Sequence, residues 1–204
     1  MTTAVFKKPI KLGITGSIGM GKTTIASEIS KHGFLVWNSD KIVHSLYKKG
    51  NDGYNIIKQL IPEAIKNNTV DRKLLSSFIL ENSETLEKIQ KLLYPILELN
   101  RMEFIKKNID KQLLVFDIPL LFETSCDKWL DIVIVATAPV EVQRKRVLGR
   151  VSMNEEKLNY IMSKQMSNTE KITKADFVLS TDTSLMTLSL QVKKIIETLI
   201  VDHA

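Results

Sequence analysis

The chain has 204 residues, 44% hydrophobic and 25% charged, which is the composition of an ordinary globular protein. This length favours one domain, or one domain with a sizeable insertion. A single cysteine, Cys126, excludes an internal disulfide framework and a cysteine-built zinc site, and fits a reducing compartment. No apolar run approaches the roughly 20 residues that span a bilayer, and no early segment is typical of a signal peptide. We therefore expect a cytoplasmic location and no membrane partner.

The formal net charge of +6 favours anionic partners. Nucleic-acid binding would be indicated by a dense basic block, but the lysines are scattered or occur in doublets such as Lys7-Lys8 and Lys193-Lys194. The charge thus predicts either a solvated lysine-rich surface or polyanionic small substrates, and no nucleic-acid partner. It predicts no particular oligomeric state.

Short apolar runs typical of strands alternate along the chain with helical patterns. The five runs are Ile10–Thr15, Phe34–Asn38, Leu113–Asp117, Asp131–Thr137 and Asp176–Ser180. This alternation predicts an α/β fold with a parallel five-stranded sheet flanked by helices in three layers. An amphipathic pattern from Leu185 to Ile200 predicts a closing helix.

Two longer stretches do not fit a simple strand–helix alternation. The segment 41–110 is helix-like throughout and is too long for one crossover, so we expect a helical insertion. The segment 140–173 is helical and rich in Arg, Lys and Gln, which suggests an exposed, mobile cover. Within a single domain of residues 1–204, this leaves 10–40, 111–139 and 174–204 as the core.

The most specific motif is G-S-I-G-M-G-K-T, which runs from Gly16 to Thr23 and satisfies G-x-x-x-x-G-K-[ST]. It follows a strand-like run and precedes a helical pattern, which is the context that such a phosphate-binding loop requires. Glycines let main-chain N–H groups turn towards phosphate oxygens, and the helix N-terminus adds partial positive charge. Lys22 is expected to reach the β- and γ-phosphates, and the Thr23 hydroxyl to bind Mg²⁺. The motif therefore predicts a P-loop NTPase fold.

The phosphate loop is shared by switch GTPases and kinases, so it does not name the reaction. A guanine-specific protein should carry N-K-x-D after a late strand and D-x-x-G after the third. The sequence contains neither, and its third strand ends D-I-P-L. We therefore expect ATP as the nucleotide.

Asp40 follows the second strand-like run, in the stretch Asn38–Asp40. Carboxyl ends of parallel strands share one edge, so Asn38–Asp40 and Asp117 are expected to meet the phosphate loop there. Asp40 has three possible roles: accepting the proton of an attacking hydroxyl, helping to hold Mg²⁺, or, like Ser39, capping the next helix. His44, one helical turn on, is an ion-pair partner, a substrate contact or an exposed residue.

Four stretches together resemble the dephospho-coenzyme A kinases. They are G-I-T-G-S-I-G-M-G-K-T-T; N-S-D-K-I-V-H-S-L, similar to the family's D-A-D-x-I-V-H-x-L; D-I-P-L-L-F-E, from Asp117 to Glu123; and the stretch from E-V-Q-R-K-R-V-L-G-R through S-K-Q-M to K-A-D-F-V-L-S. The first is common to many families. The third, together with Q-x-x-R-x-x-x-R, is much narrower, and the four cover nearly the whole chain.

The resemblance implies that ATP phosphorylates the ribose 3′-hydroxyl of dephospho-coenzyme A, the last step of coenzyme A synthesis. It implies that Asp40 is the catalytic base, that 41–110 is a coenzyme A domain, and that 140–173 is a lid over ATP. Arg146 and Arg150 fall at the family's lid arginines. We expect Arg146, rather than Arg150, to contact the transferring phosphate, with a solvated helix face as the alternative for either.

Two positions depart from the family pattern. Asn38 replaces the first acid of D-A-D, and an amide neither takes a proton at neutral pH nor offers a negative charge to Mg²⁺. Tyr94, in L-Y-P, stands where the family often has the histidine of H-P, and tyrosine does not titrate near pH 7. Asp40 is therefore left as the only carboxylate of its pair.

These expectations combine into one mechanism. The ATP-binding residues are expected to be Gly16, Gly19, Met20, Gly21, Lys22, Thr23, Thr24 and Arg150. Asp40 accepts the proton of the 3′-hydroxyl and helps Thr23 with Mg²⁺, and Lys22 and Arg146 neutralise charge on the moving phosphoryl group. Asp117 and His44 are expected to position the substrate. Another small P-loop nucleoside or nucleotide kinase, or a non-catalytic ATP-binding regulatory domain, are the alternatives.

Overall fold

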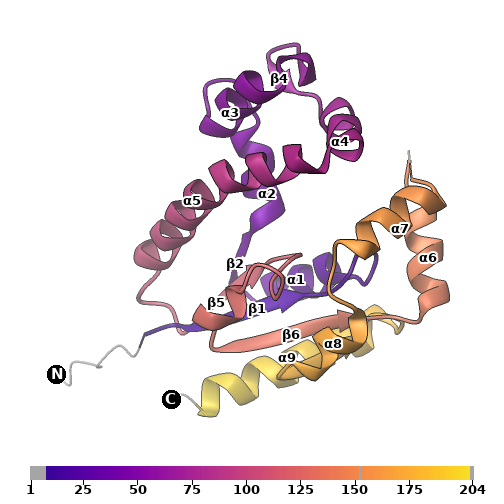
Figure 1. Cartoon of the computed structure of the whole chain (residues 1–204). Coiled ribbons are helices and arrows are strands. Elements are labelled where there is room, and N and C mark those ends of the chain that lie inside the picture. Colours follow the sequence, from indigo (N-terminus) through magenta and orange to yellow (C-terminus); the bar gives the residue numbers. More distant parts are fainter. Residues whose placement is uncertain (1–7, 152, 203–204) are drawn as a thin grey trace. The chain divides into compact units, whose positions relative to one another are not determined.

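The computed structural model describes residues 8–151 and 153–202, and the chain divides into two compact units (Figure 1). The first unit comprises the described parts of Met1–Trp37 and Asn108–Ala204, and the second is Asn38–Lys107. The second unit covers nearly the same stretch as the insertion expected at 41–110. The roles expected for the insertion and for the lid at 140–173 remain predictions.

A five-stranded sheet forms the centre of the first unit, in the order β2-β5-β1-β6-β7. Its strands are β1 (Ile10–Thr15), β2 (Leu35–Asn38), β5 (Leu113–Asp117), β6 (Ile132–Thr137) and β7 (Phe177–Ser180). The β1–β5, β1–β6 and β6–β7 pairings are all parallel. Near-continuous apolar runs suit such strands, because both faces of the sheet are covered. The predicted α/β fold with a parallel five-stranded sheet is confirmed.

Three of these strands begin one residue later than their apolar runs predicted. At two of the starts an aspartate side chain takes a main-chain hydrogen bond. Asp131 Oδ2 accepts the N–H of Lys11 at 2.8 Å, and Asp176 Oδ2 accepts the N–H of Val133 at 2.8 Å. Just before β6 and β7, the two carboxylates thus bind main-chain N–H groups of the neighbouring strands β1 and β6.

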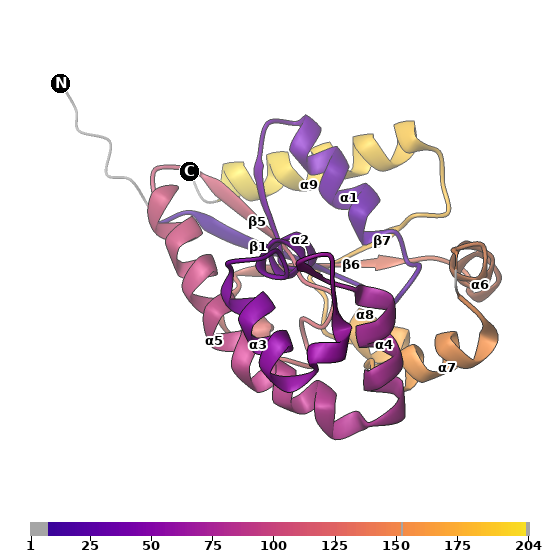
Figure 2. The same ribbon diagram turned by 90° about the horizontal axis from the view of Figure 1, so that it is seen from above.

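The first unit also contains helices. They are α1 (Lys22–Lys31), α6 (Val140–Leu148), α7 (Glu155–Ser163), α8 (Asn168–Thr173) and α9 (Leu185–Asp202), with a short 3₁₀ helix, η2 (Cys126–Trp129). Figure 2 shows α1 and α9 running side by side, in agreement with their contacts. The closing helix predicted from Leu185 to Ile200 is therefore present, and it extends to Asp202.

The main core lies between the sheet and the pair α1 and α9. Leu12 and Ile14 of β1 are fully buried there, together with Ile25 of α1 and Val192 of α9. On the other face, Phe116 of β5 packs edge-on against Trp129, with ring centroids 5.0 Å apart. Alternate residues of the strands therefore serve two apolar layers, as parallel sheets with covered faces require.

The second unit is mostly helical and has its own apolar core. Its elements are α2 (Ser39–Leu46), α3 (Asp52–Leu60), the 3₁₀ helix η1 (Pro62–Ala64), β3 (Ile65–Lys66), β4 (Thr69–Val70), α4 (Arg72–Glu81) and α5 (Ser83–Lys107). Ile57 and Ala64 are fully buried in this core. Burial raises the pKa of the Tyr47 phenol, which lies in the same core.

The expectation that 41–110 is helical throughout is wrong at one point. β3 and β4 form an antiparallel hairpin in which Ile65 pairs with Val70 and Lys66 with Thr69. The two turn residues, Asn67 and Asn68, have φ values of 48° and 59°. Both residues of such a two-residue turn need positive φ, which asparagine tolerates better than most residues, so this dipeptide was the missed signal.

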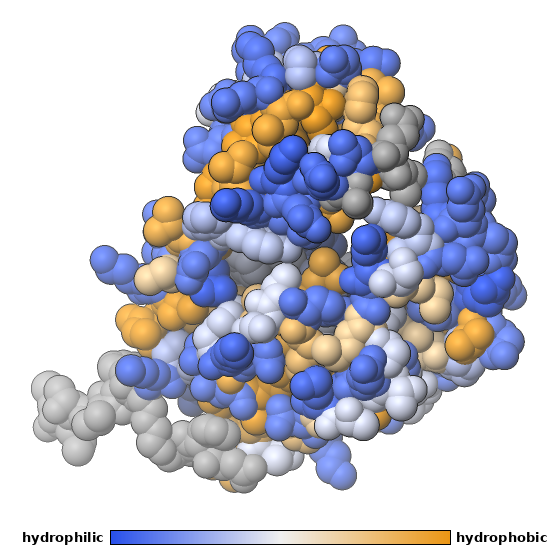
Figure 3. All heavy atoms as spheres, in the orientation of Figure 1, coloured by the Kyte–Doolittle hydropathy of each residue, from blue (hydrophilic) through white to orange (hydrophobic). Residues whose placement is uncertain are grey.

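The expectation that 140–173 is an exposed cover holds for only one side of the segment. The surface over α6 and α7, at the right of Figure 3, is largely hydrophilic. On the inner side, Gln143, Val147, Leu158 and Lys171 are buried, so the expectation is wrong there. Gln143 faces the protein because it binds the main chain of the phosphate loop, whereas Lys171 pairs with Glu123. In the part of the chain that the structure describes, the helices lack a hydrophobic stretch of the length that a bilayer requires.

Candidate active site

The phosphate loop connects β1 to α1 at the carboxyl end of the sheet. Gly21 precedes the helix with φ 84°, no side chain caps the helix start, and its first turn carries no acid. An uncapped helix N-terminus attracts anions through its N–H groups and its dipole. The predicted loop therefore has the local structure that phosphate binding requires.

Two carbonyl groups of the loop are held by side chains from distant elements. Gln143 Nε2 donates to the carbonyl oxygen of Ile18 at 2.7 Å, and Thr181 Oγ1 donates to that of Met20 at 2.9 Å. In a trans peptide the C=O and the following N–H point in opposite directions. The N–H groups of Gly19 and Gly21 are therefore directed away from these two side chains, which leaves them available for a ligand on the other side.

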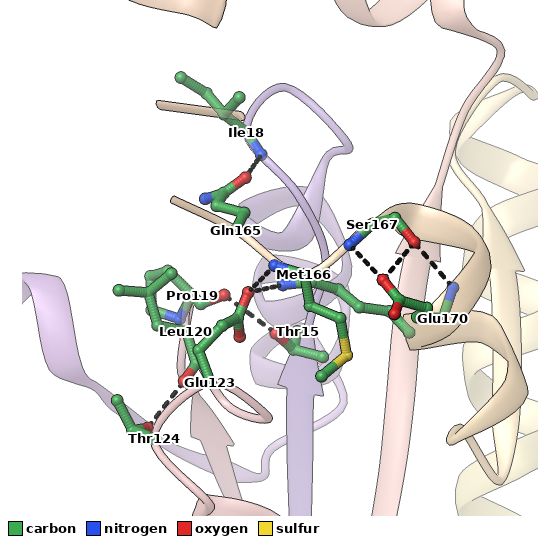
Figure 4. A network of polar contacts seen from close by, with 11 residues as sticks. Thr15, Ile18, Pro119, Leu120, Glu123, Thr124, Gln165, Met166, Ser167 and Glu170 are labelled. Atoms are coloured by element: carbon green, nitrogen blue, oxygen red, sulfur yellow. Dashed lines mark hydrogen bonds and ion pairs between the residues drawn. The ribbon is translucent and has the colours of Figure 1, made fainter. Parts of the chain in front are cut away.

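A third contact holds the start of the loop. Gln165 Oε1 accepts the N–H of Ile18 at 3.0 Å (Figure 4). The peptide groups on both sides of Ile18 are thus held, one by Gln165 and the other by Gln143. Fixed N–H directions matter because a loop that is already shaped loses less conformational entropy on binding.

Two of the loop glycines are required both by conformation and by space. Gly19 and Gly21 have φ values of 79° and 84°, where a β-carbon is strained. A β-carbon on Gly19 would lie 2.6 Å from Val147 Cγ2, and one on Gly21 would lie 2.6 Å from Thr181 Oγ1. These glycines therefore allow α6 and the end of β7 to pack directly on the loop.

Met20 was predicted to bind the nucleotide, but its side chain is buried in the core. Its Sδ accepts the N–H of Ala138 at 3.1 Å, and its own N–H donates to the carbonyl oxygen of Ser17 at 3.1 Å. Because Thr181 also binds the Met20 carbonyl, the Sδ, the N–H and the carbonyl of Met20 all form hydrogen bonds within the protein. In the structure Met20 helps to shape the loop. A contact between Met20 and nucleotide remains a prediction.

Lys22, Thr23 and Thr24 form the first turn of α1, directly after the loop. Lys22 and Thr24 are half-buried, whereas Thr23 is exposed. The exposed Thr23 hydroxyl at a helix start is suited to a cation that also binds phosphate. The described residues contain no cluster of three or more His, Cys, Asp or Glu that would hold a metal. The binding of Mg²⁺ by Thr23 remains a prediction.

Asp117 ends β5 beside the start of the phosphate loop. It pairs in register with Ile14 of β1, and it is buried. The carbonyl of Pro119, two residues on, accepts the hydroxyl of Thr15 at 3.1 Å (Figure 4). The ends of the first and third predicted strands therefore lie side by side as expected, whereas the substrate role of Asp117 remains a prediction.

Of the two arginines predicted to belong to a lid, Arg146 is anchored at the phosphate loop. Its guanidinium donates to Thr181 Oγ1 and to the Thr181 carbonyl, both at 2.8 Å, and reaches the Gly19 carbonyl at 3.5 Å. Arg150 is exposed, just beyond α6. The structure thus places Arg146 at the loop, while its contact with a transferring phosphate and the nucleotide contact of Arg150 remain predictions.

Asp40 and His44 belong to the second unit, on α2. Both are exposed, and they stand four residues apart on the helix. The alternative that Asp40 or Ser39 caps this helix is wrong, because Asn38 Oδ1 accepts the N–H of Lys41 at 2.8 Å. The roles of Asp40 as base and metal ligand, and of His44 at substrate, remain predictions.

Reasoning from the sequence missed the side chains that hold the loop, namely Gln143, Gln165 and Thr181. They lie more than 120 residues from the loop in the sequence. For the two glutamines the available signal was the polarity of 140–173, which fits solvent exposure equally well. Thr181 follows the last predicted strand, so its place at the same sheet edge was also open to inference.

The chain is similar to known proteins over most of its length. The family model described as Dephospho-CoA kinase matches residues 10–187. A dephospho-CoA kinase of Bartonella quintana is 37% identical over 191 residues, covering 93% of this chain and 97% of the relative. The solved dephospho-CoA kinase of Campylobacter jejuni has a TM-score of 0.67 at 26% identity, covering 95% and 98% of the two chains. Shikimate kinase of Bacteroides thetaiotaomicron, with a TM-score of 0.53 and 10% identity over 92% and 98% of the chains, shares the fold.

Proposed function

The chain belongs to the dephospho-CoA kinase family, and we propose that it transfers the γ-phosphoryl group of ATP to the ribose 3′-hydroxyl of dephospho-coenzyme A. The observation that carries this proposal is the family match over residues 10–187, which includes the shaped phosphate loop. The products are ADP and coenzyme A, so the reaction is the last step of coenzyme A synthesis.

The phosphate loop is the proposed site of the ATP phosphates. Main-chain N–H groups of the loop, among them those of Gly19 and Gly21, hold the oxygens, and Lys22 balances their charge. Arg146 supplies a second cation beside the loop, and stabilising charge that develops on the moving phosphoryl group lowers the barrier. Its hydrogen bonds to Thr181 keep that cation in place. Arg150 lies farther along 140–173, the proposed lid that excludes water from the reaction.

Asp40 is the proposed general base. Its carboxylate orients the 3′-hydroxyl and takes its proton as the oxygen attacks the γ-phosphorus and the bond to ADP breaks. The Asn38 cap supports this assignment, because the helix start does not need the carboxylate of Asp40. Asp117 and His44 are proposed to position the substrate.

Mg²⁺ is the proposed metal, with the Thr23 hydroxyl and the Asp40 carboxylate as the groups that would hold it. When bound, the ion neutralises phosphate charge. The exposed Thr23 fits this role, since one hydroxyl and one carboxylate suffice for a cation that keeps most of its water. Asn38, an amide, contributes no charge to the site.

A panel of acceptors tests the proposed function. The protein is mixed with Mg-ATP and, separately, dephospho-coenzyme A, adenosine, other nucleosides and shikimate, and ADP release is followed. We expect strong stimulation by dephospho-coenzyme A alone, with the new phosphate located at the 3′-position by NMR. Stimulation by a simple nucleoside would instead support another P-loop kinase, and ATP binding without any turnover would support a regulatory domain.

A further inference from the structure

A buried ion pair lies in the first unit and has no part in the chemistry proposed above. Lys171 Nζ is 2.8 Å from Glu123 Oε1; the lysine side chain is fully buried, and that of the glutamate is 16% exposed. Removing two charges from water is costly, and a well-packed apolar pair in their place is often as stable. The burial of this pair is therefore weak evidence that it stabilises the fold, and its hydrogen-bond partners show another use.

The same carboxylate oxygen of Glu123 holds the main chain of Met166. It accepts the Met166 N–H at 2.7 Å (Figure 4). Met166 comes just before α8, where Ser167 and Glu170 form a reciprocal capping box. Lys171 lies on the first turns of that helix, so the fixed helix start brings Lys171 and the Met166 N–H to one oxygen.

The neighbour of Met166 is Gln165, which binds the phosphate loop. Its Oε1 accepts the N–H of Ile18 at 3.0 Å. The Gln165 side chain has a fixed starting point only if the main chain next to it is held. Here the hydrogen bond of the Met166 N–H to Glu123 holds that main chain. Glu123 thus connects to Ile18 through two hydrogen bonds and one covalent step, all within the first unit.

We propose that Glu123 and Lys171 are positioning residues for nucleotide binding, which anchor Met166 and thereby present the Gln165 amide to Ile18 of the phosphate loop. This inference rests on the proposed function only in taking that loop as the ATP site. Lys171 compensates the charge of Glu123, and Glu123 provides the acceptor. Without the acceptor, Gln165 no longer holds the Ser17–Ile18 peptide, and the loop loses part of its preorganisation.

Two double variants distinguish the effect of losing the hydrogen-bond acceptor from the effect of losing the two charges. Glu123→Gln with Lys171→Met removes both charges but leaves an amide oxygen for the Met166 N–H. Glu123→Leu with Lys171→Met removes both charges and the acceptor. ATP affinity is measured by calorimetric titration, and the melting temperature without ligand checks folding. We expect the first variant to stay within about twofold of the unsubstituted protein, and the second to bind ATP about 3- to 10-fold more weakly, the effect of one hydrogen bond.

Gln165→Leu tests the last step of the connection. It removes the acceptor for the Ile18 N–H at nearly constant volume, so the same weakening of ATP affinity is expected. Added to the Glu123→Leu and Lys171→Met variant, it should cause almost no further loss, because both changes break one connection. Lys193→Met, in the exposed pair of Lys193 and Glu197 on α9, is the control and should leave ATP affinity unchanged.

Equal ATP affinities of the two double variants would overturn the proposal, and so would fully additive losses with Gln165→Leu. A purely structural pair would change the melting temperature without this pattern in affinity. The readout is ATP binding, so it is independent of the acceptor. If the unsubstituted protein binds ATP but does not phosphorylate dephospho-coenzyme A, the proposed function fails while the positioning test still gives its answer.

Discussion

Asn38 Oδ1 accepts a hydrogen bond from the N–H of Lys41 at 2.8 Å, and this bond caps α2. Asparagine and aspartate cap helices about equally well. The amide of Asn38 therefore caps α2 as an aspartate at this position would. Asp40 stands in the first turn of the same helix and is exposed.

Asp40→Asn should remove the proposed base without disturbing the fold. We expect turnover with dephospho-coenzyme A to fall roughly 10²–10⁴-fold, the usual contribution of a general base, with ATP affinity nearly kept. Single-turnover kinetics and ATP titration measure the two effects. Asp52→Asn, at an exposed acid in the first turn of α3, is the matched control and should retain activity. Unchanged turnover in Asp40→Asn would exclude the base.

Asn38→Ala should destabilise the second unit by about 0.5–2 kcal/mol, the usual cost of losing a helix N-cap. Asn38→Asp keeps an acceptor for the Lys41 N–H and should retain the stability of the unsubstituted protein. Urea denaturation followed by circular dichroism measures both. Equal stability of the alanine variant and the unsubstituted protein would show that the cap contributes nothing.

Thr181→Val should weaken both stability and ATP binding. The hydroxyl of Thr181 donates to the Met20 carbonyl and accepts from Arg146, so its loss leaves the buried Met20 carbonyl without this donor. The expected cost is about 1–3 kcal/mol in the free energy of unfolding. Thr181→Ser keeps the hydroxyl and should behave more like the unsubstituted protein. Thermal melting and ATP titration compare the two, and similar behaviour of both variants would contradict a role for the hydroxyl.

Glu170→Gln should change the acid dependence of stability. The hydroxyl and the N–H of Ser167 both bind the Glu170 carboxylate and hold its pKa below the ordinary value. A lowered pKa means that the charged form stabilises the fold above the ordinary carboxyl range, and that this contribution is lost as pH falls through the lowered pKa. The unsubstituted protein should therefore melt higher than the variant near neutral pH, and the difference should shrink in acid.

Melting temperatures from about pH 7 to about pH 3 measure this effect. Ser167→Ala provides the matched background, because it removes the hydroxyl that contributes most to the lowered pKa. In that background the effect of Glu170→Gln should be smaller. A difference in melting temperature that is constant across this range would contradict the assignment.

Strands and the phosphate loop could be predicted because their signals are local. A buried parallel strand needs apolar residues on both faces, and β1 and β5 begin and end where their runs predicted. The hairpin at Asn67 and Asn68 was missed because apolar residues around it fitted helical spacing as well. Only the turn chemistry of the two asparagines distinguished the two structures.

The support of the loop could not be predicted in the same way. Gln143, Gln165 and Thr181 each act through one hydrogen bond to a main-chain group distant in sequence, and such a bond leaves no periodic pattern. A polar residue on a helix is equally suited to solvent and to a buried partner. The polarity of 140–173 therefore favoured exposure, although Gln143 is buried.

By itself, the sequence determined the order of the elements, the phosphate loop and the family, because apolar periodicity and loop glycines are properties of neighbouring residues. Only the tertiary structure decided that Asn38 caps α2, that Met20 faces the core, and that Glu123 and Lys171 meet beside Met166. The physical reason is that a cap, a buried thioether and an ion pair depend on where folding brings each group and on how much water it excludes.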